Sequence, residues 1–211
     1  MLVGFIGLKG GVGKTSLSLA TAACAQDDGR SSLLIDLDPS GLAGCWRPEG
    51  FFGCVSWPRD AAEGVRGAAA GVDVACVDVA TGDTEVIGRL AAVVDVLVIP
   101  CLPSPLDVQV CAGLLEHLEA AGMTDRTQVR VLLNRVDLRT SLGRRARSDL
   151  EAAGFPMLQT VVPERVAMSD ALARGLPPSR EDARLGATLR ELSDELSALP
   201  TLVEPTVAVT H

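Results

Sequence analysis

The sequence predicts an α/β fold: a doubly wound, mostly parallel sheet with helices on both faces. Near-continuous apolar runs alternate with helical patterns along the 211 residues, and such runs are typical of parallel strands covered on both sides. Glycines stand where helical patterns end, at Gly29, Gly71, Gly122 and Gly154, as expected for helix stops. A glycine-rich segment joins the first apolar run to the first helical pattern, as in nucleotide-binding folds of this class.

The elements follow in order from the N-terminus. The predicted strands are 2–8, 32–37, 72–79, 94–101, 129–133 and 156–161. The predicted helices are 15–26, 61–69, 85–93, 106–121, 142–153, 166–174 and 183–199. Segment 41–58 is rich in Gly, Pro and aromatic residues, which predicts an irregular loop over a satellite hydrophobic cluster or facing a partner. We expect one domain over residues 1–199 and a tail, 200–211, that is disordered or forms an arm.

Composition narrows the classes of protein. A content of 47% hydrophobic and 22% charged residues fits a globular protein, and no apolar run reaches the ~20 residues that span a membrane. The N-terminus lacks the basic region and cleavage site of a secretory signal, so we expect a cytoplasmic protein. The six cysteines form no C-x-x-C pair, which favours reduced core thiols over bridges or metal ligands.

Residues 10–15, of sequence GGVGKT, predict a phosphate-binding loop. Its glycines let backbone N–H groups converge on phosphate oxygens, Lys14 reaches the β/γ-phosphates, and Thr15 offers a hydroxyl to Mg²⁺. The first glycine of the usual G-x-x-x-x-G-K-[ST] pattern would stand at Leu8. The chain's two lysines, Lys9 and Lys14, both lie in this loop, which indicates that the site needs compact ammonium groups rather than guanidinium groups.

Three carboxylates follow predicted strands. Asp36 and Asp38 end the second strand, and Asp78 ends the third. Because the carboxyl ends of parallel strands meet at one edge of the sheet, these side chains are expected beside the phosphate-binding loop. Asp78 has the form of a Walker B acid, and the three together predict a site for magnesium and water. An aspartate at a strand end also commonly caps the next helix, which is the alternative for each.

Charge is unevenly distributed. Residues 1–120 carry seven Lys/Arg and fifteen Asp/Glu, whereas residues 121–211 carry twelve of each, so the net charge of −8 belongs to the first part. Within the second part, residues 126–147 hold seven arginines against Asp137 alone. This basic segment is either a solvated helix face or a surface for nucleic-acid phosphates. The candidate DNA-binding residues are Arg139, Arg144, Arg145 and Arg147.

A family resemblance rests on these motifs in combination. Residues 9–15 resemble the deviant Walker A motif of the ParA/MinD family, in which a second lysine precedes two glycines. The Asp36-x-Asp38-Pro39 stretch resembles that family's next motif. Segment 100–107 resembles the short ParF-like partition ATPases, and segments 133–135 and 162–165 resemble their adenine-side segments. The resemblance covers residues 1 to about 177, and it departs at Ser40, where the family often has Gln, and at segment 79–83.

The resemblance implies a single P-loop ATPase domain that is monomeric with ADP and forms a nucleotide-sandwich homodimer with ATP. Lys9 would reach the partner's phosphates, while Lys14 and Asp38 complete the catalytic set in cis. ATP or ADP would be held by Gly10, Gly11, Val12, Gly13, Lys14, Thr15, Ser16, Asn134, Arg135, Pro163 and Glu164. Mg²⁺ would be served by Thr15, Asp36, Asp38 and Asp78.

The resemblance further implies slow hydrolysis stimulated by a small adaptor protein of ParB type, and non-specific DNA binding by the dimer. The expected function is partition or positioning of a plasmid, a chromosome or another cargo from the nucleoid. One alternative is a protein cargo such as a carboxysome (the McdA type). Another is a MinD-like membrane-associated regulator, which needs a basic amphipathic C-terminal helix that residues 200–211 do not supply.

Two further alternatives concern chemistry. A metabolic relative, such as a nitrogenase-reductase-like or cobyrinate-synthase-like enzyme, would need cluster-binding cysteines or additional substrate-binding sequence. GTP is the alternative nucleotide, because Asn134-Arg135-Val136-Asp137 resembles the N-K-x-D element in which Asp accepts from guanine. The surrounding resemblance is to ATPases, so ATP is the favoured nucleotide.

Overall fold

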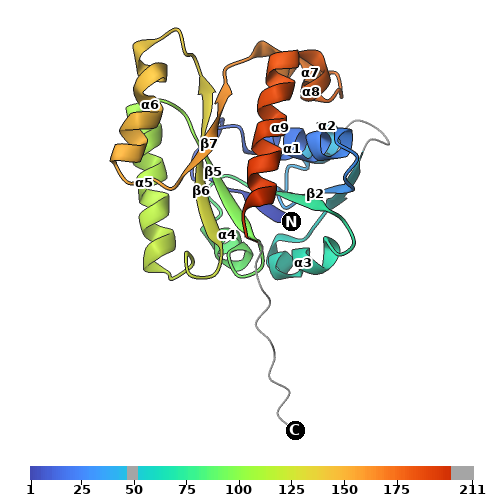
Figure 1. Cartoon of the computed structure of the whole chain (residues 1–211). Helices are drawn as coiled ribbons and strands as arrows, with labels where there is room; N and C mark the ends of the chain where they lie inside the picture. Colours follow the sequence, from blue (N-terminus) through green and yellow to red (C-terminus); the bar gives the residue numbers. More distant parts are fainter. Residues whose placement is uncertain (47–51, 201–211) are drawn as a thin grey trace.

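A computed structural model describes residues 1–46 and 52–200 of the chain. Its centre is a seven-stranded sheet of order β3-β2-β4-β1-β5-β6-β7, in which every neighbouring pair of strands is parallel (Figure 1). The strands are β1 (Leu2–Phe5), β2 (Ser32–Asp36), β3 (Gly53–Ser56), β4 (Val74–Asp78), β5 (Val96–Cys101), β6 (Gln128–Val136) and β7 (Met157–Pro163). The α/β, parallel-sheet prediction is therefore confirmed.

Helices cover both faces of the sheet (Figure 1). They are α1 (Lys14–Asp27), α2 (Leu42–Trp46), the 3-10 helix η1 (Arg59–Gly64), α3 (Val65–Ala68), α4 (Thr84–Leu90), α5 (Pro105–Ala120), α6 (Ser141–Ala152), α7 (Val166–Ala173), α8 (Pro178–Glu181) and α9 (Ala183–Ala198). In β1, Leu2 joins the core cluster with α4 and α5, whereas Val3 joins the cluster with α1 and α9. Successive strand side chains point to opposite faces, so both faces need cover, which explains the continuous apolar runs.

Segment 41–58 differs from the prediction of an irregular loop. It contains α2 and the edge strand β3, which is short, half exposed and begins with Gly53, so it gives no apolar run. Trp57 is half-buried against the core, and its indole Nε1 donates to the Ala61 carbonyl (2.8 Å). Residues 47–51 and the tail 201–211 lie outside the described residues, as do the expectations made for them.

Two helical predictions also changed. The predicted helix 61–69 is divided between η1, which is kinked at Ala61, where the backbone angles are non-helical, and the single turn α3. The short helix α8 was not predicted, and its four residues are too few to show a periodic pattern.

The order of the strands in the sheet indicates where a ligand site is expected. Strand β1 lies between β4 and β5: the chain runs from β1 to β2, β3 and β4 on one side of it and then crosses to β5, β6 and β7 on the other. In open parallel sheets the ligand crevice lies at such a switch point, outside the carboxyl ends of the strands. The carboxyl ends of β2, β4, β6 and β7, and the segments that follow β1 and these strands, carry the candidate residues to that edge.

Candidate functional site

The glycine-rich loop between β1 and α1 needs glycine at two described positions. Gly11 has φ 77° and Gly13 has φ 100°, in the left-handed region that side chains other than glycine rarely adopt. A Cβ at Gly13 would also lie 2.4 Å from Nδ2 of Asn134. That buried amide donates to the Val12 carbonyl (2.8 Å). Strand β6 therefore holds the loop in place, a structural role for Asn134 that the sequence did not reveal.

Lys14 is the first residue of α1 and is only 6% exposed. Burial lowers the pKa of its ammonium group, while the nearby carboxylates of Asp78 and Asp38 raise it. The Nζ atom donates to the hydroxyl of Thr81 (2.7 Å). The ammonium group has three N–H donors, so the others remain available after the Thr81 contact. A buried cation with free donors at a helix N-terminus suits a phosphate. Thr81 was not among the predicted site residues, although it closely follows the Walker B acid.

Asp78 is buried at the end of β4, with 1% of its surface exposed. Its Oδ2 accepts from the Thr15 hydroxyl (2.7 Å), and its Oδ1 has no hydrogen-bond partner among the described residues. Burial raises the pKa of Asp78 to about 7, against the opposing effect of the Thr15 hydrogen bond. A buried carboxylate oxygen without a partner, beside a threonine hydroxyl, is the oxygen donor set that suits Mg²⁺.

The two carboxylates after β2 differ in what they contact. Asp36 is buried, and its oxygens accept from the backbone N–H groups of Asp38 (2.9 Å) and Gly44 (3.4 Å). Burial raises the pKa of Asp36. Asp38 is half-buried, and its Oδ1 accepts from the Ser40 N–H (2.9 Å). Asp36 therefore braces the turn after β2, with both of its carboxylate oxygens engaged by backbone N–H groups, which speaks against its predicted role as a metal ligand. Asp38, by contrast, lies close enough to Lys14 to raise the pKa of that ammonium group.

Lys9 contacts its own chain. Its Nζ lies 2.7 Å from Oδ1 of Asp107, in the first turn of α5. The Asp107 side chain is 5% exposed and that of Lys9 is 38% exposed. The Ser104 hydroxyl donates to the other Asp107 oxygen and accepts from the Asp107 N–H (3.2 Å). The helix cap thus fixes the carboxylate that holds Lys9, a partner that lies 98 positions away in the sequence.

A groove of about 410 Å³ lies on the other side of the loop. Its lining includes Gly11, Gly13, Ser16, Leu17, Asn134, Arg135, Pro163 and Glu164. Arg135 and Glu164 form an ion pair across it (2.8 Å). The predicted adenine-side residues therefore do come together beside the phosphate-binding loop, as a base site requires.

Asp137 does not line this groove. Both of its carboxylate oxygens accept from the Arg139 guanidinium (2.9 Å each), and this partner lowers the pKa of Asp137 to about 2. The acceptor that a guanine-reading N-K-x-D element needs is thus engaged elsewhere, which weighs against GTP.

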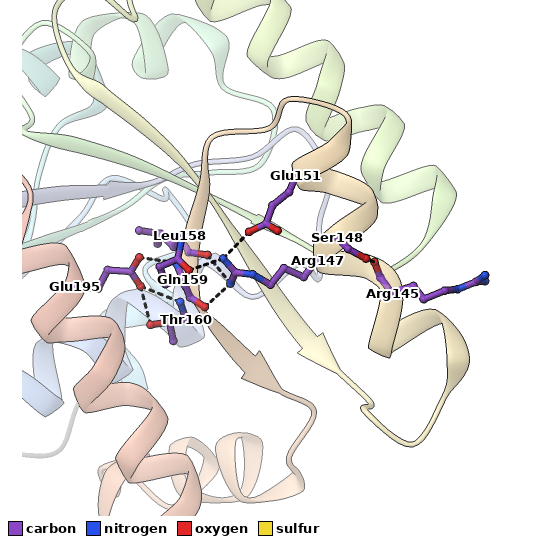
Figure 2. Close-up of polar contacts among 8 residues, drawn as sticks. All are labelled: Arg145, Arg147, Ser148, Glu151, Leu158, Gln159, Thr160 and Glu195. Atoms are coloured by element: carbon purple, nitrogen blue, oxygen red, sulfur yellow. Dashed lines mark hydrogen bonds and ion pairs between the residues drawn. The ribbon is translucent and has the colours of Figure 1, made fainter.

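Arg147 is used inside the chain rather than presented to DNA. Figure 2 shows its guanidinium turned toward β7, where it donates to the carbonyls of Leu158 (3.1 Å) and Gln159. It also pairs with Glu151 one turn along α6 (2.7 Å). Glu195 of α9 accepts from the Gln159 N–H at the same strand edge. Arg147 and Glu195 together occupy backbone groups of an edge strand, which protects it from further pairing.

Of the other three candidate arginines, two make contacts within the chain and one does not. Arg139 pairs with Asp137, and Arg144 donates to the Arg139 carbonyl (2.7 Å). The Arg145 side chain has no hydrogen bond or ion pair with any described residue and points away from this network (Figure 2). Of the four arginines, Arg145 is the one whose guanidinium is free to meet an external anion.

Comparison with known proteins agrees with this geometry. The family model described as "CobQ/CobB/MinD/ParA nucleotide binding domain" matches residues 3–178. The chain is similar to the protein named "Maintenance of carboxysome distribution protein A" of Halothiobacillus neapolitanus, with 29% identity over 94% of both chains. It is 34% identical to the protein of the same name from Gloeobacter kilaueensis, over 80% of this chain and 79% of that one.

Among solved structures, the chain is similar to the septum site-determining protein MinD of Pyrococcus horikoshii complexed with Mg-ADP. The TM-score is 0.71 at 17% identity, and the match covers 94% of this chain and 96% of that one. At this identity the likeness establishes the fold.

Proposed function

Because the chain belongs to the CobQ/CobB/MinD/ParA family of nucleotide-binding domains, we propose that it is a positioning ATPase that works as an ATP-dependent homodimer. The observation that carries the proposal is the unpartnered Oδ1 of Asp78, buried beside Thr15 and Lys14 at the phosphate-binding loop. This arrangement suits a nucleotide with Mg²⁺ better than a protein or sugar ligand, because it offers donors to phosphate and oxygens to a hard cation.

The residues have distinct roles in this proposal. The backbone of residues 10–13 and the Lys14 ammonium bind the β/γ-phosphates, and Thr15 and Asp78 hold Mg²⁺, which supplies charge neutralisation when bound. Asp38 orients the attacking water, since its carboxylate is half-buried and close enough to Lys14 to raise the pKa of that ammonium group. The groove bordered by Asn134 and Pro163 takes the adenine.

Lys9 completes the site of a second copy of the chain. Its contact with Asp107 must break before its ammonium can reach phosphates outside its own loop. The Lys9–Asp107 pair thus keeps the monomer inactive until the partner's nucleotide offers a stronger anion. Such a charge supplied from another subunit stabilises the phosphoryl-transfer transition state, as an arginine finger does.

The relatives favour a protein cargo over a plasmid or chromosome. Two relatives that span most of this chain are named for maintaining carboxysome distribution, so we propose the McdA type of function, with an adaptor protein linking the dimer to its cargo. Within the described residues, no helix is long and apolar enough to cross a membrane. The MinD-like alternative depends on the C-terminal tail, which lies outside the described residues.

Non-specific DNA would serve as the matrix on which the dimer is distributed, in the cytoplasm over the nucleoid. The structure supports Arg145 as the contact among the four predicted arginines, because the other three guanidinium groups are engaged within the chain. A dimer doubles the number of such contacts, so binding would depend on ATP and weaken with salt.

The proposal is tested by measuring molar mass by light scattering with ATP and with ADP. The wild-type protein is expected to dimerise with ATP alone, and Lys9→Ala is expected to bind ATP in calorimetry while remaining monomeric. A Lys9→Ala protein that dimerises like the wild type would contradict the role of Lys9 across the dimer. Affinity capture with the wild-type dimer then tests the cargo: a plasmid centromere-binding protein as the partner would contradict the McdA type.

A further inference from the structure

The end of β6 is irregular where it borders the base groove, the groove of about 410 Å³ that is proposed to take the adenine. Strand β6 takes three residues to pass from Leu133 to Val136. The paired part of β7 takes two, from Val161 to Pro163. One extra residue in β6 makes a β-bulge, and such bulges re-aim a side chain. Arg135 lies in the bulge and has φ 54°, the one positive φ of a residue other than glycine in the described part of the chain.

The bulge lets two successive side chains serve the same groove. Successive residues of a regular strand point to opposite faces of the sheet, yet Asn134 and Arg135 both line the base groove. Asn134 is buried and donates to the Val12 carbonyl, whereas the Arg135 side chain is 52% exposed. A left-handed backbone is unfavourable for a residue with a Cβ, and strain of this kind is typically retained at ligand clamps.

Glu164 is the partner of Arg135 across the groove. The backbone N–H of Glu164 donates to the Val136 carbonyl (3.1 Å), which ties the segment after β7 to the end of β6. The Arg135 guanidinium donates to Oε1 of Glu164 (2.8 Å), and both residues line the groove. The ion pair therefore joins the two strand ends that border the base site.

Two other arginines lie near this ion pair, and each is engaged by a different carboxylate. The pKa of the Arg139 guanidinium is raised mainly by Asp137, which accepts two hydrogen bonds from it, and to a smaller extent by Glu164. Arg165 lines the groove and pairs with Asp182 (3.8 Å). Neither of them makes the contact that joins the two sides of the groove.

We infer that Arg135 and Glu164 form a clasp that must open each time a nucleotide enters or leaves the base groove. A half-exposed ion pair opens and closes fast compared with ligand exchange, so the fraction of time that it is closed slows entry and release by the same factor. The clasp thereby sets how quickly ADP is replaced by ATP. The inference rests on the proposed function and concerns the regulation of the same site.

The test compares rates of nucleotide entry and release. The probe is Mg-ADP with an N-methylanthraniloyl group on its ribose; stopped-flow mixing gives the entry rate, and a chase with excess ADP gives the release rate. Glu164→Gln and Arg135→Gln should each raise both rates by about two- to fivefold, the range of an exposed ion pair. A simple electrostatic effect on the anionic nucleotide would instead raise the entry rate in the first variant and lower it in the second.

Two further variants locate the effect. Glu63→Gln breaks an exposed ion pair with Arg89 (3.7 Å) outside the groove lining and should leave both rates unchanged. Exchanging the charges, by Arg135→Glu with Glu164→Arg, should bring both rates back to within about twofold of the wild type, because the pair is restored. Wild-type rates in the single variants, a release rate that rises without the entry rate, or an exchanged pair as fast as the single variants would overturn the inference.

Binding of the labelled nucleotide separates failure of the clasp from failure of the proposed function. A wild-type protein that does not bind Mg-ADP contradicts the proposed function and the clasp with it. Binding at rates that the two single variants do not change contradicts the clasp alone.

Discussion

Releasing Lys9 should strengthen the ATP-dependent dimer. Asp107→Asn removes the charge that holds the Lys9 ammonium at 2.7 Å and keeps the side chain's shape and its place in the α5 cap. The Lys9 side chain is 38% exposed, so solvent screening limits the pair to about 1 kcal/mol. Dimerisation breaks the pair in both subunits, which amounts to about 2 kcal/mol and about a thirtyfold lower dimer Kd for the variant.

The assay is sedimentation of the protein over a range of concentrations with a non-hydrolysed ATP analogue. Glu116→Gln, on the same helix, controls for the change in net charge and should leave the dimer Kd unchanged. The combination of Asp107→Asn with Lys9→Ala should remain monomeric. An Asp107→Asn dimer no tighter than that of the wild type, or a tighter one that persists without Lys9, would refute the argument that the pair restrains Lys9.

The remaining predictions concern single residues. Lys14→Ala should abolish ATP binding in calorimetry, because the buried ammonium is the main cation at the loop; retained affinity would contradict the phosphate site. Asp38→Ala should slow hydrolysis and prolong the dimer, and normal turnover would remove Asp38 from the mechanism. Burial raises the pKa of Asp78 to about 7 in the folded protein, so the folded state retains the proton longer than the unfolded state, and the free energy of unfolding falls as pH rises from about 4 to 7. Asp78→Asn should therefore be more stable than the wild type in urea at about pH 8, by up to about 4 kcal/mol, and equal to it near about pH 4; a less stable variant at the higher pH would contradict the burial argument. Arg145→Ala should reduce ATP-dependent retention on DNA by about tenfold at low salt, whereas Arg147→Ala should reduce the free energy of unfolding instead; retention that follows Arg147 would reverse the assignment.

The sequence predicted the fold well because its strands carry their own signal. Six of the seven strands are largely apolar and contribute to the core, and adjacent positions such as Leu2 and Val3 fill two separate core clusters. The seventh, β3, has four half-exposed residues at the sheet edge, so neither periodicity nor hydrophobicity marks it.

The sequence predicted where the site residues lie in the fold, but not which groups their side chains contact. The order of motifs indicates that Lys14, Thr15 and Asp78 meet at the carboxyl edge, and the structure brings them together. The pattern D-x-D-P is the same whether the first carboxylate binds a metal or braces a turn, and only the geometry assigns Asp36 to the backbone. The Lys9–Asp107 pair depends on the approach of segments far apart in the sequence.

The arginine-rich segment shows the same limit. Its density of charge indicates a basic surface, but the carbonyls that receive Arg147 belong to β7, and their availability follows from that strand's position at the sheet edge. Arg145, two positions earlier, has the same chemistry and no such neighbour. Charge counting alone does not distinguish the two.

The most direct test of a site shared between two copies is subunit mixing. Lys9→Ala and Asp38→Ala are each expected to hydrolyse ATP poorly alone. In a mixed dimer, the Lys9→Ala subunit keeps its own Asp38 and receives Lys9 from its partner, so one complete site is restored. Because Lys9→Ala does not pair with itself, its dimers in the mixture are mixed ones, and turnover per mixed dimer should be about half of the wild-type value, since each holds one working site of two. No recovery on mixing, with both variants still binding ATP, would contradict the account.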